Sequence, residues 1–298
     1  MKEIANGIHT DISIEDYHAN RSHISATQIK KARESLNHFN WYMTGKMGHE
    51  EKSCFGFGNA FELALVNQKE YLSKVAVMPD GEWVEDIKKA RPELTKVRSS
   101  KEYGIEETKW KEANRGKYEI MDQGPESFET IECMLDTCNK DPYIRRLIDN
   151  TEYQVSLFWT DEATGLNLKT RPDVCKRKKN VLVNIKTIDD GSPDAFSRDL
   201  VKWDYPMQAC IEMLGSLKTG LMETVDNYLW LVCEKKPPYN ATIYEFDKVD
   251  IAECMDMLHF TLHKIAKAKE EDIWPGYGGL SDNPYGILTA RIPAWYKL

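Results

Sequence analysis

Apolar residues recur at helical spacing through the first part of the chain. Residues 25–45 (SATQIKKARESLNHFNWYMTG) predict one helix, with Ser25 as N-cap, Gln28 completing a capping box and Gly45 ending it. Residues 78–124 are polar and irregular by comparison. Their pattern is compatible with a lid, an arm, or helices packed on the main body.

Two further segments predict helices. Residues 54–72 open with a glycine pair, continue with apolar residues at helical spacing, and place Glu62 in about the first turn. Residues 127–149 predict another helix. Its expected core residues are Met134, Ile144 and Leu147.

After residue 150, the pattern changes from helical spacing to β-rich runs. Residues 153–161, 168–175 and 181–188 are each bounded by turn residues, which predicts a three-stranded antiparallel meander. Residues 192–217 predict a helix, a break and a second helix, and residues 225–247 predict two strands around a Pro-Pro turn.

The remaining pattern sets the fold class. Residues 249–271 form an amphipathic pattern whose apolar face is expected to be Ile251, Met255, Leu258, Leu262 and Ile265. Strands bracketed by helices predict an α/β or α+β fold with a mixed central sheet. We find no linker between residues 125 and 298, and the aromatic tail after residue 273 is expected to be extended.

Composition and charge narrow the class of protein. The chain has 298 residues, 41% of them hydrophobic, which is enough for a sizeable core. The net charge of −8 argues against a surface that is basic throughout, although a local basic channel for nucleic acid remains compatible with it. The seven cysteines form no CxxC pair, and no signal peptide or membrane span is apparent. We therefore expect a soluble cytoplasmic protein.

The candidate chemistry lies in the meander. Side chains two residues apart on a strand share a face, so Asn184 and Lys186 are expected to point the same way. Asp173 lies on the preceding strand, across a basic turn, and Glu62 could join it from a separate helix. Carboxylate and amide oxygens suit Mg²⁺, and a lysine can orient a water or stabilise developing charge.

Each of these residues also has a simpler reading. Asp173 after Pro172 could begin a turn, and Glu62 could complement the dipole of its helix. A lysine on a strand usually faces solvent, and the basic run 176–179 is typical of a solvated hairpin tip. The residues alone do not decide between a hairpin and a nuclease site.

The order of the motifs adds a family resemblance. "RPD" followed by "NIK" resembles the PD-(D/E)XK nuclease signature, and the chain more specifically resembles the nuclease domain of RecE (exonuclease VIII) and its phage relatives. The resemblance runs along almost the whole chain. It also rests on HISATQIKKARESLNHFNWYMTGK, FGNAFELALV, SLFWTDEATGLNLKTRPDVC, VNIKTIDD, WDYPMQACIEMLG, CEKKPPYNATIYEFD, and WPGY with IPAW.

The resemblance implies roles for individual residues. Asp173 and Glu62 would be metal ligands, with Asn184 and the main-chain carbonyl of Ile185 as further ligands, and Lys186 would be the catalytic lysine. Gln208 would contact the substrate phosphate or the lysine. The residues implied to contact DNA are Arg171, Lys169 and Tyr205, with Lys176 and Arg177 of the basic turn as further candidates.

Three positions depart from the family pattern. Glu62 stands where His is usual, and a carboxylate ligates Mg²⁺ at least as well. Glu212 stands where Tyr is usual, with no evident consequence. Asn184 stands where the family has Asp or Glu, which removes one negative charge and predicts weaker metal binding and reduced turnover. Three explanations stay open: an engineered substitution, a natural variant in which Glu62 compensates, and loss of catalysis.

The resemblance implies a Mg²⁺-dependent exonuclease, with Mn²⁺ as an alternative metal and two ions per site. It would digest linear double-stranded DNA from 5′ to 3′ and leave 3′ single strands for recombination. It implies a homo-oligomeric ring, trimer or tetramer, a single-strand annealing protein as partner, and a bacterial cytoplasm with phage or prophage origin. Residues 1–298 would be one domain, with a helical part in residues 1–124 and the catalytic core in residues 125–298. The alternatives are a catalytically silent DNA-binding or assembly subunit, and a PD-(D/E)XK endonuclease.

Overall fold

The computed structural model describes residues 4–47, 54–280 and 285–292. Its central sheet has five strands in the order β10-β9-β8-β7-β4. The strands are β4 (Glu152–Tyr153), β7 (Val174–Lys176), β8 (Val181–Ile188), β9 (Asn227–Glu234) and β10 (Ala241–Glu245). Strand β8 runs parallel to β9 and antiparallel to β7, so the expected mixed sheet flanked by helices is confirmed.

The predicted three-stranded meander is wrong in one respect, because its second strand is interrupted. Residues Asn167–Thr170 form β6, which pairs with β5 (Ser156–Thr160) in a separate sheet with β1 (Gly7–His9). Residues after the interruption belong to β7 and pair with β8 instead. Pro172, which has no N–H to donate to a ladder, lies in the interruption beside Asp173.

The helix predicted over residues 25–45 is two helices. α2 (Ala26–Glu34) ends at Ser35, whose backbone is extended (φ −170°) and whose hydroxyl accepts from the His38 N–H at the start of α3 (Leu36–Met43). The capping box at Ser25 is confirmed. A serine can compete with the helical backbone for hydrogen bonds, and the apolar pattern does not reveal where it will do so.

Two other predicted helices are divided in the same way. Residues 54–72 are covered by α4 (Cys54–Val66) and α5 (Gln68–Lys74), with Asn67 capping the second. Residues 127–149 are covered by α8 (Phe128–Lys140) and α9 (Pro142–Ile148), where Asp141 caps α9. Proline at the first position of a helix favours a new start there.

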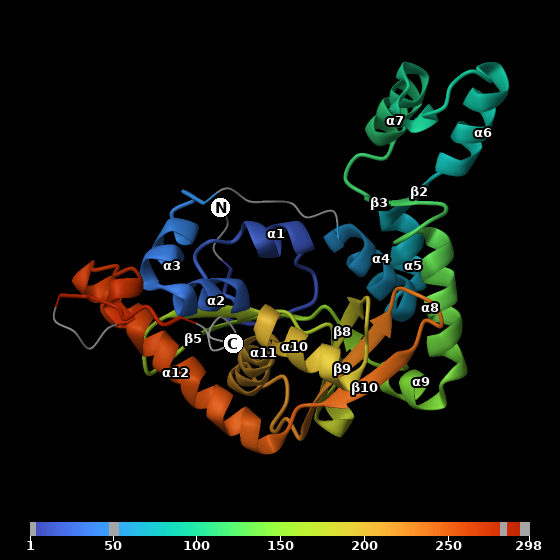
Figure 1. Ribbon diagram of the computed structural model, residues 1–298. Helices are drawn as coiled ribbons and strands as arrows, with labels where there is room; N and C mark the ends of the chain where they lie inside the picture. The colour runs from blue at the N-terminus through green and yellow to red at the C-terminus, as the bar shows by residue number, and fades with distance from the viewer. Residues whose placement is uncertain (1–3, 48–53, 281–284, 293–298) are drawn as a thin grey trace.

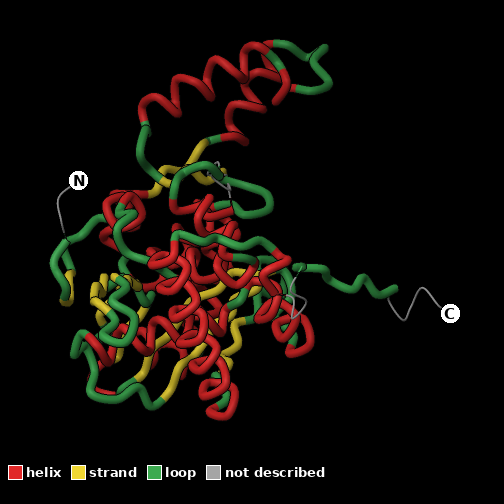
Figure 2. The backbone as a smooth tube through the Cα atoms, turned by 90° about the vertical axis from the view of Figure 1, so that its left-hand side faces the viewer, coloured by secondary structure: helices red, strands yellow, loops and turns green. Residues whose placement is uncertain are grey.

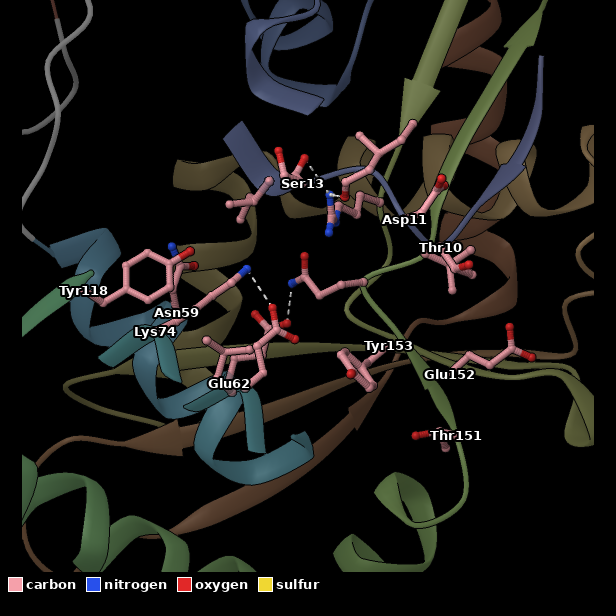
Figure 3. A pocket seen from close by; sticks show the side chains of 17 residues that line it. Thr10, Asp11, Ser13, Asn59, Glu62, Lys74, Tyr118, Thr151, Glu152 and Tyr153 are labelled. Atoms are coloured by element: carbon pink, nitrogen blue, oxygen red, sulfur yellow. Dashed lines mark hydrogen bonds and ion pairs between the residues drawn. The ribbon is translucent and has the colours of Figure 1, made fainter. Parts of the chain in front are cut away.

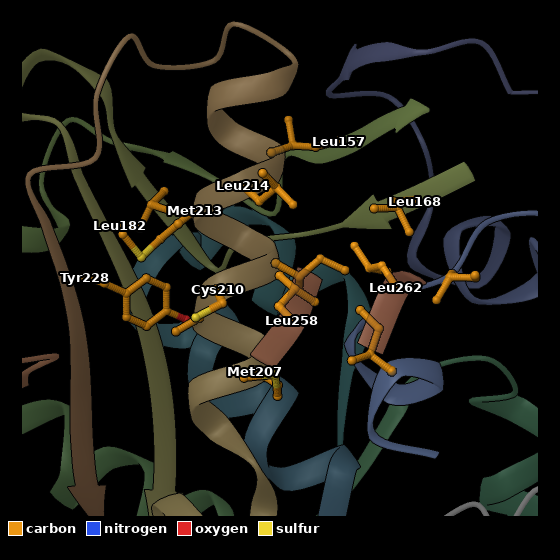
Figure 4. Close-up of a cluster of buried hydrophobic side chains, with 14 of the residues drawn as sticks. Leu157, Leu168, Leu182, Met207, Cys210, Met213, Leu214, Tyr228, Leu258 and Leu262 are labelled. Atoms are coloured by element: carbon orange, nitrogen blue, oxygen red, sulfur yellow. The ribbon is translucent and has the colours of Figure 1, made fainter. Parts of the chain in front are cut away.

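Helices cover both faces of the central sheet. The odd-numbered side chains of β8, Val183 and Ile185, pack with residues of α4, α8 and α9. Leu182 points to the other face, toward α11 (Tyr205–Lys218), α12 (Lys248–Glu271) and α2. Figure 4 shows α11 lying across this second face beside Tyr228 of β9. The predicted helix, break, helix is confirmed as α10 (Pro193–Trp203), Asp204 at φ 53° and α11.

An arm accounts for the polar region between residues 78 and 124. Strands β2 (Val75–Met78) and β3 (Tyr118–Met121) pair in parallel at its base. Between them, α6 (Asp80–Ala90), a short 3₁₀ turn (Val97–Ser99) and α7 (Lys101–Ala113) project from the body (Figures 1 and 2). Of the three readings that the sequence left open, the structure therefore shows the arm.

The remaining elements are short. They are α1 (Ile14–Ala19) and the 3₁₀ turns Arg177–Lys179 and Tyr277–Leu280. Residues 285–292 run away from the body without regular structure, and Trp295 of the IPAW motif lies outside the described residues (Figure 2). Across the described residues, we find no helix with the length and apolar character needed to cross a membrane.

Candidate active site

Strand β8 places Asn184 and Lys186 on the face covered by α11. Asn184 is completely buried, and neither its Oδ1 nor its Nδ2 has a hydrogen-bond partner in the described part of the chain. An unsatisfied buried amide costs about 1–3 kcal/mol, so this residue destabilises the fold as it stands. A buried water or another bound group would supply the missing partner of these atoms.

Asp173 lies directly against the next strand. Its Oδ2 accepts from the Ile185 N–H at 2.8 Å. The N–H and C=O of one strand residue point to the same side of the strand, so the Ile185 carbonyl also lies on the Asp173 side. Burial raises the pKa of Asp173, while Lys186, the Ile185 N–H and Arg171 oppose that rise.

Glu62 reaches the site from α4 and is tied to Asp173 through Gln154. The Gln154 amide donates to Glu62 Oε1, and the Gln154 N–H donates to the Asp173 carbonyl at 3.0 Å. Gln154 adopts φ 52°, which is uncommon for a residue with a side chain. Burial and the nearby Asp173 charge raise the pKa of Glu62 well above its ordinary value. Sequence reasoning missed Gln154, because nothing in the sequence distinguishes it from a loop glutamine.

Lys186 is held by residues of α11. Its Nζ donates to Gln208 Oε1 at 3.0 Å and lies 4.2 Å from the centre of the Tyr205 ring. Burial lowers the pKa of Lys186, and the acids Asp173, Glu212 and Glu62 oppose that change. The predicted contact between Gln208 and the lysine is therefore present.

Gln208 also donates a hydrogen bond to a buried acid, Glu212. Its Nε2 donates to Glu212 Oε1 at 2.9 Å, and the Tyr228 hydroxyl donates to Glu212 Oε2 at 2.7 Å. We call these four residues, Lys186, Gln208, Glu212 and Tyr228, the Lys186 network. Burial and the charge of Asp173 raise the pKa of Glu212 to about 8. The sequence drew attention to Glu212 without assigning it a role, and it gave no reason to single out Tyr228.

A pocket of about 470 Å³ opens beside this cluster (Figure 3). It lies between the N-terminal segment, α4 and the chain leading into β5. Glu62 and Gln154 line it together with the cations Arg171 and Lys74. Glu62 therefore has a side that solutes can reach.

Lys169 is not an exposed phosphate contact, contrary to the prediction. It is 2% exposed, and its ammonium donates to the main-chain carbonyls of Tyr17 and Asn20. Burial, with a smaller effect of Arg21, lowers the pKa of Lys169 to about 8. The lysine instead attaches α1 to β6, a role that the alternation of a strand cannot reveal.

The other basic candidates differ in their availability. The Arg171 guanidinium donates to the carbonyls of Ile12 and Ser13, at 3.1 and 3.4 Å, while lining the pocket. Lys176 donates to carbonyls at the end of α9, and Arg177 pairs with Glu152 at 2.7 Å. The two residues of the basic turn thus have local partners, and an exposed ion pair of this kind contributes little to stability.

The oxygen atoms of the cluster fit a divalent cation. In the residues that the structure describes, no three His, Cys, Asp or Glu side chains come close enough to hold a metal by themselves. An ion here would also need the unpartnered Asn184 Oδ1 or the Ile185 carbonyl. Hard cations accept such mixed oxygen ligands, and a positive charge would relieve the repulsion between Glu62 and Asp173.

Comparison with known proteins agrees with this geometry. Residues 25–283 match the family described as a PDDEXK-like domain of unknown function (DUF3799). The chain belongs to this family. The match spans α2 to the C-terminal tail, so it contains Glu62, Asp173, Asn184 and Lys186. The predicted PD-(D/E)XK assignment is therefore confirmed, without resolving the RecE branch.

A solved structure shows the same fold. A crystal structure described as a "putative exonuclease" from Eubacterium rectale superposes with a TM-score of 0.57 at 14% identity, covering 96% of each chain. At that identity the likeness shows the fold alone. A structure of SSO0001 has a TM-score of 0.28 at 14% identity, covering 70% of this chain and 85% of that chain, and carries no argument. No curated protein matches the chain.

Proposed function

We propose that this protein is a divalent-metal-dependent DNA exonuclease of the RecE type. The observation that carries the proposal is the convergence of Asp173, Glu62 and Lys186, with Asn184 on the same strand face as Lys186 and without a hydrogen-bond partner among the described residues. An acid pair next to a lysine, inside a PDDEXK-like fold, is suited to phosphodiester hydrolysis.

The acids and their neighbours would hold a cation, and Lys186 would direct a water. Asp173, Glu62, Asn184 and the Ile185 carbonyl would hold Mg²⁺ or Mn²⁺, with two ions in the full site. Such a metal polarises the scissile phosphate and lowers the pKa of an attacking water. Lys186 has three donors, of which Gln208 takes one and the Tyr205 ring faces another. Its remaining donor is available for the water or a phosphate oxygen.

The substrate would be the end of linear double-stranded DNA, degraded from 5′ to 3′ to leave 3′ single strands for recombination. Arg171 lines the pocket beside Glu62 and is the cation placed to meet phosphate there, because Lys74 is paired with Glu70 and the other charged lining residues are acids. We further propose a homo-oligomeric ring, trimer or tetramer, and a single-strand annealing protein as partner. The setting would be the cytoplasm of a bacterial host, with phage or prophage origin. These finer points rest on the resemblance of the sequence motifs.

The test compares 5′-labelled linear duplex with closed circular DNA, in Mg²⁺ and in Mn²⁺. We expect degradation of the linear substrate, survival of the circle, and no activity in Lys186→Ala. Asn184→Asp should raise the rate by about 10- to 100-fold, because a charged ligand holds the cation better. Equal rates for Asn184→Asp and the unchanged protein would contradict the assigned role of Asn184, and cutting of the circle would instead indicate an endonuclease.

The burial of Asn184 favours a second candidate, a catalytically silent DNA-binding or assembly subunit. Its neutral amide is sealed from solvent, which a readily exchanging metal ligand would not require. Under this alternative, the protein would bind duplex ends but leave them intact at high concentrations of either metal. Gain of cleavage in Asn184→Asp alone would then identify a site that has lost catalysis.

A further inference from the structure

The orientation of the Gln208 amide matters for Lys186. Its Oε1 faces the ammonium at 3.0 Å, and its Nε2 faces Glu212. An ammonium has donors only, and a glutamine amide has an acceptor at one end and donors at the other. A reversed amide would direct its NH₂ group at the Lys186 NH₃⁺ group and push the lysine away.

Glu212 is the group that selects this orientation. Its Oε1 accepts from Gln208 Nε2, while its Oε2 accepts from the Tyr228 hydroxyl. Glu212 is 1% exposed and Tyr228 is fully buried, so bulk water does not replace either partner. Oε1 stays an acceptor whether the carboxyl is ionised or carries its proton on Oε2. The orienting effect therefore does not depend on the charge of Glu212.

The contacts of Glu212 do not indicate a cation ligand. Among the described side chains, it does not combine with Glu62 and Asp173 into a group that could hold a metal. Both of its oxygens are also already engaged by donors. Apart from the direct effect of its charge on Lys186, Glu212 influences the site through its hydrogen bond to Gln208.

We propose that Glu212, fixed by Tyr228, is a positioning residue that orients the Gln208 amide and thereby holds the Lys186 ammonium at the reacting centre. The proposal rests on the nuclease function proposed above, and it assigns a role to a residue that departs from the family pattern.

The decisive variant removes the acceptor of the Gln208 amide and leaves no buried hydroxyl unpaired. Glu212→Met alone would leave the Tyr228 hydroxyl without its acceptor, and the fold would suffer for that reason. Combining it with Tyr228→Phe replaces both partners with apolar side chains of similar size. If Glu212 only stabilised the fold, the double variant would recover that stability. The Gln208 amide would still lack the acceptor that orients it.

We expect the double variant to melt within about 4 °C of the unchanged protein. Its affinity for duplex DNA, measured without a divalent metal, should be unchanged. Its single-turnover cleavage rate should fall by about 10- to 100-fold, as misplacement of a catalytic group predicts. Cleavage at the unchanged rate would overturn the proposal.

Two further variants complete the comparison. Glu212→Gln keeps an acceptor toward Gln208 and should retain most of the rate; a rate as low as that of the double variant would contradict the proposal. Asp80→Asn is the matched control, since Asp80 is a buried acid that accepts from a tyrosine hydroxyl, that of Tyr103 at 2.6 Å, in the arm. It should leave the cleavage rate unchanged.

Two situations need a separate measurement. If the double variant does not fold, the cleavage rate of Glu212→Asp is measured instead, because aspartate is shorter by one methylene. A slower rate supports the proposal, and an unchanged rate overturns it. If the unchanged protein does not cleave DNA, the function proposed above fails. In that case, mass spectrometry can measure how fast an amine reagent modifies Lys186. The inference requires faster modification in the double variant than in the unchanged protein, and equal rates would overturn it.

Discussion

At the scale of single residues, the site is defined by polar groups that the fold leaves in costly positions. Asn184 is buried with no hydrogen-bond partner among the described residues, and burial raises the pKa values of Glu62 and Asp173. A protein selected only for stability would carry apolar side chains there. The cost is understandable if the same groups bind a cation, which supplies the missing interactions.

Asn184→Leu tests this exchange of stability for function. Leucine has nearly the shape of asparagine and no polar atoms, so the unfolding free energy should rise by about 1–3 kcal/mol. Urea unfolding with a chelator present measures it, and DNA cleavage should be lost in the same variant. A fall in stability would show that the amide has a partner in solution.

The acids also predict how stability depends on pH. The folded-state pKa of Glu212, about 8, lies above its ordinary value of 4.5. Between these values the folded protein retains a proton that the unfolded chain has released, so the unfolding free energy falls as pH rises. Glu62 and Asp173 are shifted in the same direction. Melting curves of the metal-free protein should show this fall, and Glu212→Gln should make it shallower; equal slopes would contradict the shift.

At the scale of elements, the site depends on where strands and helices stop. The sequence pattern predicted the strand that carries Asn184 and Lys186, but it joined β6 and β7 into one strand. The interruption between them places Asp173 beside Ile185. Periodicity could not reveal this, because the apolar alternation continues across Pro172 while the pairing partner changes.

Close approach of α11 to the β5–β6 sheet predicts contrasting effects for two glycines. A Cβ on Gly215 would lie 2.8 Å from atoms of Thr170 and Trp159, so Gly215→Ala should cost about 1–3 kcal/mol and reduce activity by shifting α11. Gly104 of α7 has open space, and Gly104→Ala should add about 0.5–1 kcal/mol. Thermal unfolding of both variants checks this, and a neutral Gly215→Ala would mean that α11 moves freely.

At the scale of the whole molecule, two apolar cores lie on opposite faces of one central sheet, and the arm projects from the body. β8 contributes side chains to both cores, which couples them. The arm has its own polar anchor, in which Asp80 accepts from Arg98 at 2.9 Å and from the Tyr103 hydroxyl. The single-domain prediction can be tested by whether the two cores unfold together.

Calorimetry provides that measurement. We expect one cooperative transition for the full chain, because β8 belongs to both cores. Replacing residues 81–116 with a flexible linker should leave this transition within about 4 °C of its original temperature, since the arm lies outside the two cores. Two separate transitions would show that the cores unfold independently and that the chain has more than one domain.

The sequence by itself determined the alternation of helices and strands, the shared face of Asn184 and Lys186, and the ordered motifs that indicated a PD-(D/E)XK nuclease. These follow from local periodicity and from residue types, which act over a few positions. Only the tertiary structure decided that Lys169 is buried, that Gln154 links Glu62 to Asp173, and that Glu212 and Tyr228 support Lys186. Those contacts join residues far apart in the chain, and their energies depend on burial, which no local pattern encodes.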